Sequence, residues 1–170
     1  MKFYAQPYSL DAQGFYFETY EEFTEKLKTA KDSFGNPVEE FEFQVIDGTQ
    51  EECELVKAVG GIDQGNIENV IDFIDTSDED EWPVIFFLLD NNICDNLEDA
   101  KSNASDYSIV ESSLLDAATE LFDECWLTSI PKEVARYIDY ESFANDCRCG
   151  GDMVEFEFGG KTYTCTNANQ

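Results

Sequence analysis

The chain has 170 residues, of which 42% are hydrophobic and 14% aromatic, so it can bury one or more small cores. It carries 10 Lys and Arg against 38 Asp and Glu, a net charge of −28, whereas a small domain ordinarily carries a net charge of magnitude about 2–8. This balance excludes direct binding to nucleic acid and to anionic membranes, because both polyanions are bound through Lys and Arg. Self-repulsion at this charge destabilises the compact state, which indicates a function that uses the charge.

The first segment, near residues 1–59, has the pattern of a β-β-α-β unit. Thr19 and Glu22 form a capping-box pattern, which predicts the start of a helix with Phe23 on its buried face. The sequence Phe-Gly-Asn-Pro at 34–37 is expected to end this helix. Aromatic-rich or alternating stretches predict three strands, at 3–5, 14–17 and 41–45. Residues 51–59 are predicted to form a short helix.

The second segment, near residues 60–103, is expected to be mainly helical and is the most purely anionic part of the chain. Between Ala58 and Ala100 there are 12 Asp and Glu and no Lys or Arg. Asn66 is positioned to cap a helix. Residues at helical spacing predict the two faces of that helix. The buried face is expected to carry Ile67, Val70, Ile71 and Ile74, and the exposed face Glu68, Asp72 and Asp75. The apolar run 84–89 fits a buried strand and a helix equally well.

The third segment, near residues 104–170, is predicted to contain three helices followed by a hairpin. Ser113 is expected to cap the first helix and Asp139 the third. Pro131 suits the first turn of the second helix, which is expected to carry Val134, Tyr137 and Ile138. A hairpin is predicted to close the segment. Apolar and acidic residues alternate over 154–158, Gly159 and Gly160 form the turn, and Tyr163 leads the return strand.

The sequence offers little that could support catalysis or bind a cofactor. It has no histidine, so neither a Ser-His-Asp nor a Cys-His arrangement can be built, and no phosphate-binding glycine loop is present. Residues 75–86 begin like a calcium-binding loop but have Asp80 and Phe86 where the loop needs Gly and Glu. Three cysteines are close enough in sequence to be weighed as zinc ligands: Cys147, Cys149 and Cys165. A non-enzymatic protein without cofactor or metal is therefore expected.

The compartment is predicted from what the sequence does not contain. Residues 1–7 lack the apolar region and cleavage site of a secretory signal, and no apolar run approaches the roughly 18 residues needed to cross a bilayer. A cytoplasmic protein with reduced thiols is therefore expected.

The acidity has two interpretations. One is a solvated surface of the kind that halophilic proteins carry. The other treats the carboxylates as stand-ins for phosphates: 28 net charges match the charge on about 48 Å of duplex, since B-DNA carries about one charge per 1.7 Å. The carboxylates expected to form such a surface are Asp63, Glu68, Asp72, Asp75, Asp78, Glu79, Asp80, Glu81, Asp90, Asp95, Glu98, Asp99, Asp106, Glu111, Asp116, Glu120, Asp123 and Glu124.

Motifs at both ends of the chain resemble one known family. The N-terminal motifs are FYAQPY at 3–8, GFYFE at 14–18, VEEFE at 38–42 and IDG at 46–48. The C-terminal motifs are more specific: Ile130-Pro131, then YIDYE at 137–141, Ala144, Asp146 and Gly151-Asp152. With these motifs the chain resembles the ArdA-like antirestriction proteins over nearly its whole length.

The resemblance implies an elongated α+β protein of three small domains, near 1–59, 60–103 and 104–170, with antiparallel sheets and helices at both ends. It implies mimicry of bent B-form DNA and inhibition of type I restriction-modification enzymes, with the specificity and modification subunits of the methyltransferase core as the partner. It also implies a homodimer formed through the antirestriction motif, with the interface expected at Ile130, Val134, Tyr137, Ile138, Asp139, Tyr140 and Phe143. Two alternatives remain open, an acidic adaptor for another basic protein and a divalent-cation buffer.

Overall fold

The computed structural model describes residues 1–169, and it contains helices and two small antiparallel sheets, which confirms the predicted α+β class. The chain forms two compact units, Met1–Lys101 and a second that begins at Ser102. The first two predicted segments therefore lie within one compact unit, and a finer boundary near residue 60 stays a prediction. Among the described residues, no helix has the length and apolar character of a membrane-crossing segment.

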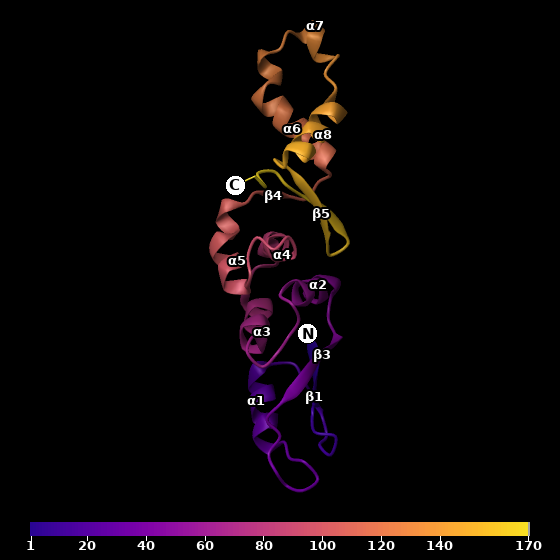
Figure 1. Ribbon diagram of the computed structural model, residues 1–170. Coiled ribbons are helices and arrows are strands. Elements are labelled where there is room, and N and C mark those ends of the chain that lie inside the picture. Colours follow the sequence, from indigo (N-terminus) through magenta and orange to yellow (C-terminus); the bar gives the residue numbers. More distant parts are fainter. Residues whose placement is uncertain (170) are drawn as a thin grey trace. The chain divides into compact units, whose positions relative to one another are not determined.

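The first unit consists of a three-stranded sheet with helices on one face, followed by a helical segment (Figure 1). The strand order is β2-β1-β3 and both pairings are antiparallel, with Tyr4 opposite Tyr16 on one side and Gln44 on the other. The elements in chain order are β1 (Lys2–Pro7), β2 (Phe15–Phe17), α1 (Tyr20–Thr29), β3 (Phe41–Asp47), α2 (Gln50–Ala58), α3 (Ile67–Thr76), the 3₁₀ helix η1 (Glu79–Glu81), α4 (Trp82–Asp90) and α5 (Leu97–Asn103).

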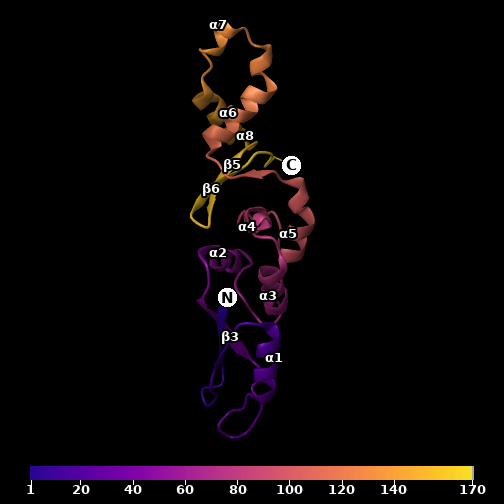
Figure 2. The ribbon, with the colours of Figure 1, turned by 180° about the vertical axis from the view of Figure 1, so that it is seen from behind.

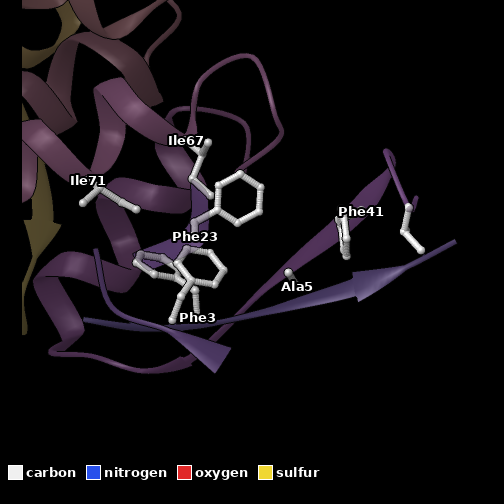
Figure 3. Close-up of a cluster of buried hydrophobic side chains, with 8 residues drawn as sticks. Phe3, Ala5, Phe23, Phe41, Ile67 and Ile71 are labelled. Atoms are coloured by element: carbon white, nitrogen blue, oxygen red, sulfur yellow. The ribbon is translucent and has the colours of Figure 1, made fainter. Parts of the chain in front are cut away.

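An aromatic core joins the sheet of the first unit to helices α1 and α3. Alternation along the strands sends one set of side chains to this face, where Figure 3 shows residues from β1, β3, α1 and α3 entering one cluster. Phe17 is central, with its ring centroid 5.3 Å from that of Phe3 and 5.2 Å from that of Phe23. Ile67 and Ile71 close the cluster from α3. Burial of these residues fixes one face of α3 inward, so its other face is turned to solvent.

We expect Phe17→Ala to lower the free energy of unfolding of the first unit by about 3–5 kcal/mol, because it opens a cavity in this aromatic cluster. The neighbouring Tyr16 lies on the opposite face of the same strand and is 52% exposed, so Tyr16→Ala serves as the matched control and should cost about 1 kcal/mol or less. Chemical denaturation followed by circular dichroism measures both. Equal losses for the two variants would contradict the assigned sheet faces.

The second unit is a helical pair on a small sheet with the strand order β4-β6-β5. Leu114, Ala118, Ala144, Cys147 and Met153 form its buried core, where helices α6 and α8 lie side by side (Figure 2). The elements in chain order are the 3₁₀ helix η2 (Ala104–Asp106), β4 (Ile109–Val110), α6 (Leu114–Cys125), the 3₁₀ helix η3 (Leu127–Ser129), α7 (Lys132–Ala135), α8 (Tyr140–Gly150), β5 (Val154–Phe158) and β6 (Lys161–Cys165).

The structure decides one ambiguous prediction and corrects two others. The ambiguous run 84–89 belongs to helix α4, with Pro83 in its first turn. Asn66 stands at the N-cap position of α3, but its side chain makes no cap hydrogen bond, since its Oδ1 accepts from the backbone N–H of Asp63 instead. The helix predicted after Pro131 was expected to carry Tyr137 and Ile138, which is wrong, because α7 is a single turn that ends at Ala135. Helix α5 and strand β4 were not predicted.

Candidate anionic surface

Helix α3 presents the first row of carboxylates. Glu68, Asp72 and Asp75 are exposed, as the helical spacing predicted. Residues four apart on a helix are about 6 Å apart along its axis, so the three carboxylates follow one line over roughly 10 Å. The buried face of α3 holds this line rigidly toward solvent.

The second row lies on the short 3₁₀ helix η1, which leads into α4. Asp78 caps it by accepting a hydrogen bond from the N–H of Asp80, and the acidic run 78–81 therefore stands at the N-terminal end of α4. The positive end of the helix dipole favours carboxylates there. Trp82 anchors the junction, because its ring is buried and its Nε1–H donates to the hydroxyl of Ser77 at 2.8 Å.

Carboxylates continue beyond η1 in the first unit. Asp90 ends α4, Asp95 lies in the connection to α5, and Glu98 and Asp99 begin α5. All 12 carboxylates between Ala58 and Ala100 are exposed. No lysine or arginine occurs between them in the sequence, and a nearby cation is the ammonium of Lys101, 5.4 Å from the ring centroid of Phe73 on α3.

The second unit carries the remaining six predicted carboxylates, and three of them are engaged within the chain. Asp123 is half-buried and accepts a hydrogen bond from the hydroxyl of Tyr140, Glu111 forms an ion pair with Lys161 at 2.8 Å, and Asp116 accepts a hydrogen bond from the hydroxyl of Ser113 at 2.6 Å. All but Asp123 are exposed, and three carboxylates form a stripe along α6 at four-residue spacing: Asp116, Glu120 and Glu124.

An open concavity of about 380 Å³ lies between α1 and α3, and the sequence did not predict it. Glu68, Asp72 and Asp75 line one side, and Tyr20 and Glu21 line the other. The charge of Glu68 raises the pKa of the Tyr20 phenol, with burial and a hydrogen bond to Glu68 adding to the effect. The concavity thus combines several carboxylates with a neutral phenol, and its chemistry suits an arginine or lysine head group.

The residues predicted for the dimer interface divide into two groups. Val134 and Tyr137 are exposed, and the guanidinium of Arg136 stands 5.0 Å from the Tyr137 ring centroid. Tyr140 and Phe143 are half-buried and pack against Phe122 of α6. Asp139 is exposed but caps α8, and Ile130 and Ile138 are half-buried. The dimer interface itself stays a prediction. Val134 and Tyr137 are the predicted interface residues most accessible to a second copy of the chain.

Asp139 makes the start of α8 sensitive to pH. Its carboxylate accepts hydrogen bonds from the backbone N–H and the hydroxyl of Ser142, which hold the pKa of Asp139 below its ordinary value. A lowered folded-state pKa means that the cap is fully effective above the pKa of the unfolded chain and is lost as the pH falls through the folded value.

We therefore expect the hydrogen-exchange protection of the Ser142 amide to fall on acidification below the ordinary pKa of an aspartate. Asp139→Asn keeps a capping side chain without the titration and should remove this dependence. A local readout is needed, because protonation also relieves the repulsion of a chain that carries −28. Protection that is independent of pH in the unmodified protein would contradict the assignment.

The three cysteines close in sequence differ in their burial. Cys147 and Cys165 are buried whereas Cys149 is exposed. Burial raises the pKa of the Cys147 and Cys165 thiols, and the carboxylates of Asp152 and Asp146 add to the effect at Cys147. Such thiols stay protonated at neutral pH and react slowly. Among residues 1–169, no three Cys, Asp or Glu side chains are grouped closely enough to hold a metal ion.

The fold and the surface define a small α+β protein that presents carboxylates on consecutive helices. A family model described as antirestriction protein (ArdA) matches residues 9–161. The chain therefore belongs to the ArdA family of antirestriction proteins, whose membership implies antirestriction of type I restriction-modification enzymes. This is a family of inhibitor proteins and not of known enzymes. Comparison with curated proteins and with solved structures finds no match.

Proposed function

We propose that the protein inhibits its target as a DNA mimic, with carboxylates in the place of backbone phosphates. The observation that carries the proposal is the stretch from Asp63 to Asp99, in which 12 exposed carboxylates stand on consecutive short helices and their connections, without a single lysine or arginine in that part of the sequence. A groove that binds DNA displays Lys and Arg toward phosphates, and charge-assisted hydrogen bonds form with carboxylates by the same chemistry.

The proposed binding site is the DNA groove of the methyltransferase core, formed by its specificity and modification subunits. The second unit carries further exposed carboxylates, and the concavity beside Glu68 offers a place for one projecting basic side chain. The proposal includes a cytoplasmic site of action, where the enzyme meets DNA. It also includes a homodimer formed through the region 130–143, which would double the number of phosphate stand-ins.

A competition experiment tests the mimicry. A labelled duplex is bound to a purified type I methyltransferase, and the protein is added in increasing amounts at several salt concentrations. A DNA mimic displaces the duplex, and its apparent affinity falls as salt rises, because charges separated by more than about 8–10 Å are screened at physiological ionic strength. An acidic adaptor or a divalent-cation buffer leaves the duplex bound, and that result would contradict the proposal.

A further inference from the structure

The carboxylate rows of α3 and η1 are joined by a connection of two residues. Helix α3 ends at Thr76, Ser77 and Asp78 have extended backbone conformations with ψ of 156° and 132°, and η1 begins at Glu79. Each of the two connecting residues has two soft dihedral angles, so the local backbone does not by itself fix how η1 lies relative to α3. The spacing between the rows therefore depends on contacts across the connection.

Two hydrogen bonds span this connection through one hydroxyl group. The indole Nε1–H of Trp82 donates to the hydroxyl of Ser77 at 2.8 Å, and the same hydroxyl donates to the carbonyl of Phe73 at 2.6 Å. Phe73 belongs to α3, and Trp82 is the first residue of α4, directly after η1. The Ser77 hydroxyl therefore joins the helix before the connection to the helix after it, and we refer to these two hydrogen bonds as the Ser77 bridge.

The Ser77 bridge lies in a largely buried setting. Trp82 is 6% exposed and Phe73 2%, and Ser77 is half-buried. A buried N–H that loses its acceptor stays unsatisfied, and this costs more free energy than an ordinary hydrogen bond contributes. The connection 77–78 can therefore open only if the Trp82 indole leaves its buried position or if water enters the bridge.

The charge of the two rows acts against the bridge. Asp72 and Asp75 precede the connection, four carboxylates follow at 78–81, and all six are exposed. No lysine or arginine lies between them in the sequence. Like charges repel one another and favour conformations in which the two rows are farther apart. A connection of two residues permits such a motion, and the Ser77 bridge opposes it.

We propose that Ser77 and Trp82 are positioning residues for inhibition, and that the hydrogen bond between them fixes the spacing between the carboxylate rows of α3 and η1. The inference rests on the proposed function and deepens it. The charges of a DNA duplex follow one another at a regular spacing, so a groove built for them pairs with all the phosphate stand-ins only if these are held at one spacing. The bridge holds the rows before binding, so little entropy is lost when the partner is met.

The first test variant is Ser77→Ala, which removes the acceptor of the Trp82 indole without changing the net charge. In the duplex-displacement assay with a purified type I methyltransferase, we expect its Kd to rise about 10-fold at physiological salt. We also expect its affinity to depend less steeply on salt, because the salt slope counts the charges that are paired at once. A residue that supports only the fold would leave the salt slope of the folded protein unchanged.

Two matched variants separate the bridge from the mere loss of a hydroxyl. Thr76→Ala removes the neighbouring hydroxyl, which also donates to a carbonyl of α3, that of Asp72 at 2.6 Å, whereas the Trp82 indole donates to Ser77. This control should bind as the unmodified protein does. Ser77→Thr keeps a hydroxyl at position 77 and should restore both the Kd and the salt slope.

The variant Trp82→Phe tests the bridge from its other end, because it removes the donor and leaves Ser77 in place. It should raise Kd and reduce the salt slope as Ser77→Ala does. The double variant should bind no more weakly than the weaker of the two single variants, since all three lose the same hydrogen bond. In NMR, exchange of the indole N–H should be slow for Trp82 and fast for Trp126, which is 45% exposed, and Ser77→Ala should accelerate only that of Trp82.

The outcomes distinguish the positioning role from the mimicry, with thermal unfolding to verify that each variant is folded. If Ser77→Ala binds as the unmodified protein does, while neutralising the carboxylates of 72–81 weakens binding, the positioning role is overturned and the mimicry stands. A raised Kd with an unchanged salt slope, or no recovery in Ser77→Thr, would also overturn the positioning role. If Trp82→Phe does not fold, Ser77→Ala and Ser77→Thr decide the question alone. An unmodified protein that does not displace the duplex would overturn both proposals.

Discussion

Neutralising six carboxylates on consecutive helices should weaken binding to the methyltransferase about 100-fold, whereas each single neutralisation should change Kd less than about threefold, because one exposed charge pair contributes little. The six positions span the end of α3 and the whole of η1, and all are exposed. Isosteric amides preserve shape and remove charge. The substitutions are Asp72→Asn, Asp75→Asn, Asp78→Asn, Glu79→Gln, Asp80→Asn and Glu81→Gln. The duplex-displacement assay at physiological salt measures them.

The control for this variant has the same net charge with a different distribution. Six other exposed carboxylates of the first unit are replaced by their amides: Glu18, Glu25, Glu39, Glu40, Glu42 and Asp47. If the position of the charges matters, the control binds markedly better than the test variant and the salt slope falls more in the test variant. Equal losses of affinity in the two variants would show that the total charge, and not the position of the carboxylates, determines binding. A single substitution that abolished inhibition would show that binding depends on one local site and not on a distributed surface.

The carboxylate rows were predictable from sequence because they depend on local periodicity. On a helix the inward positions of Ile67 and Ile71 fix where Glu68 and Asp72 point, and no knowledge of the tertiary structure is needed. The same rule could not decide between strand and helix for 84–89, because the run is apolar on every side. In the structure it is a helix, with buried residues on most of its circumference.

Features that join distant parts of the chain were not predictable in this way. Tyr20 and Glu68 are 48 positions apart in the printed sequence, and they meet only because α1 and α3 cover the same sheet face. The connection between β1 and β2 meets the connection between α1 and β3 through a backbone hydrogen bond from Ser33 to Asp11, and no periodicity in the sequence links two such loops. Helix α7 is a single turn without a buried residue, so no packing against the rest of the chain extends it to Tyr137 and Ile138.

Replacing Tyr137 by Asp should convert the proposed homodimer to monomers at micromolar concentration. A chain with a net charge of −28 can associate with itself only through a surface that is locally apolar or locally less acidic. Tyr137 is 74% exposed, Val134 52%, and the adjoining Lys132 and Arg136 offset part of the repulsion. A carboxylate at position 137 adds charge and removes an aromatic anchor from the middle of this surface. Light scattering at physiological salt reports the mass directly.

Two control variants separate loss of the interface from loss of the fold. Tyr16→Asp makes the same chemical change at another exposed tyrosine and should leave the dimer intact. Tyr140→Phe removes a hydroxyl that donates to Asp123 within the chain, so it should also leave the dimer intact, whereas Tyr140→Asp would disturb the packing on Phe122 and could not identify an interface. A folded Tyr137→Asp protein that remained fully dimeric would show that the dimer forms through another surface.

Salt should act on the proposed dimer and on the proposed enzyme complex in opposite directions. Screening weakens the attraction between carboxylates and a basic groove, and it also weakens the repulsion between two chains of −28 that meet through an apolar surface. Raising the salt concentration should therefore strengthen self-association while it releases the methyltransferase. Dimer dissociation constants measured over the same salt series as the displacement assay provide the comparison. If both associations weakened together with salt, the dimer would be held by charge pairs, and Tyr137 and Val134 would not be its main contacts.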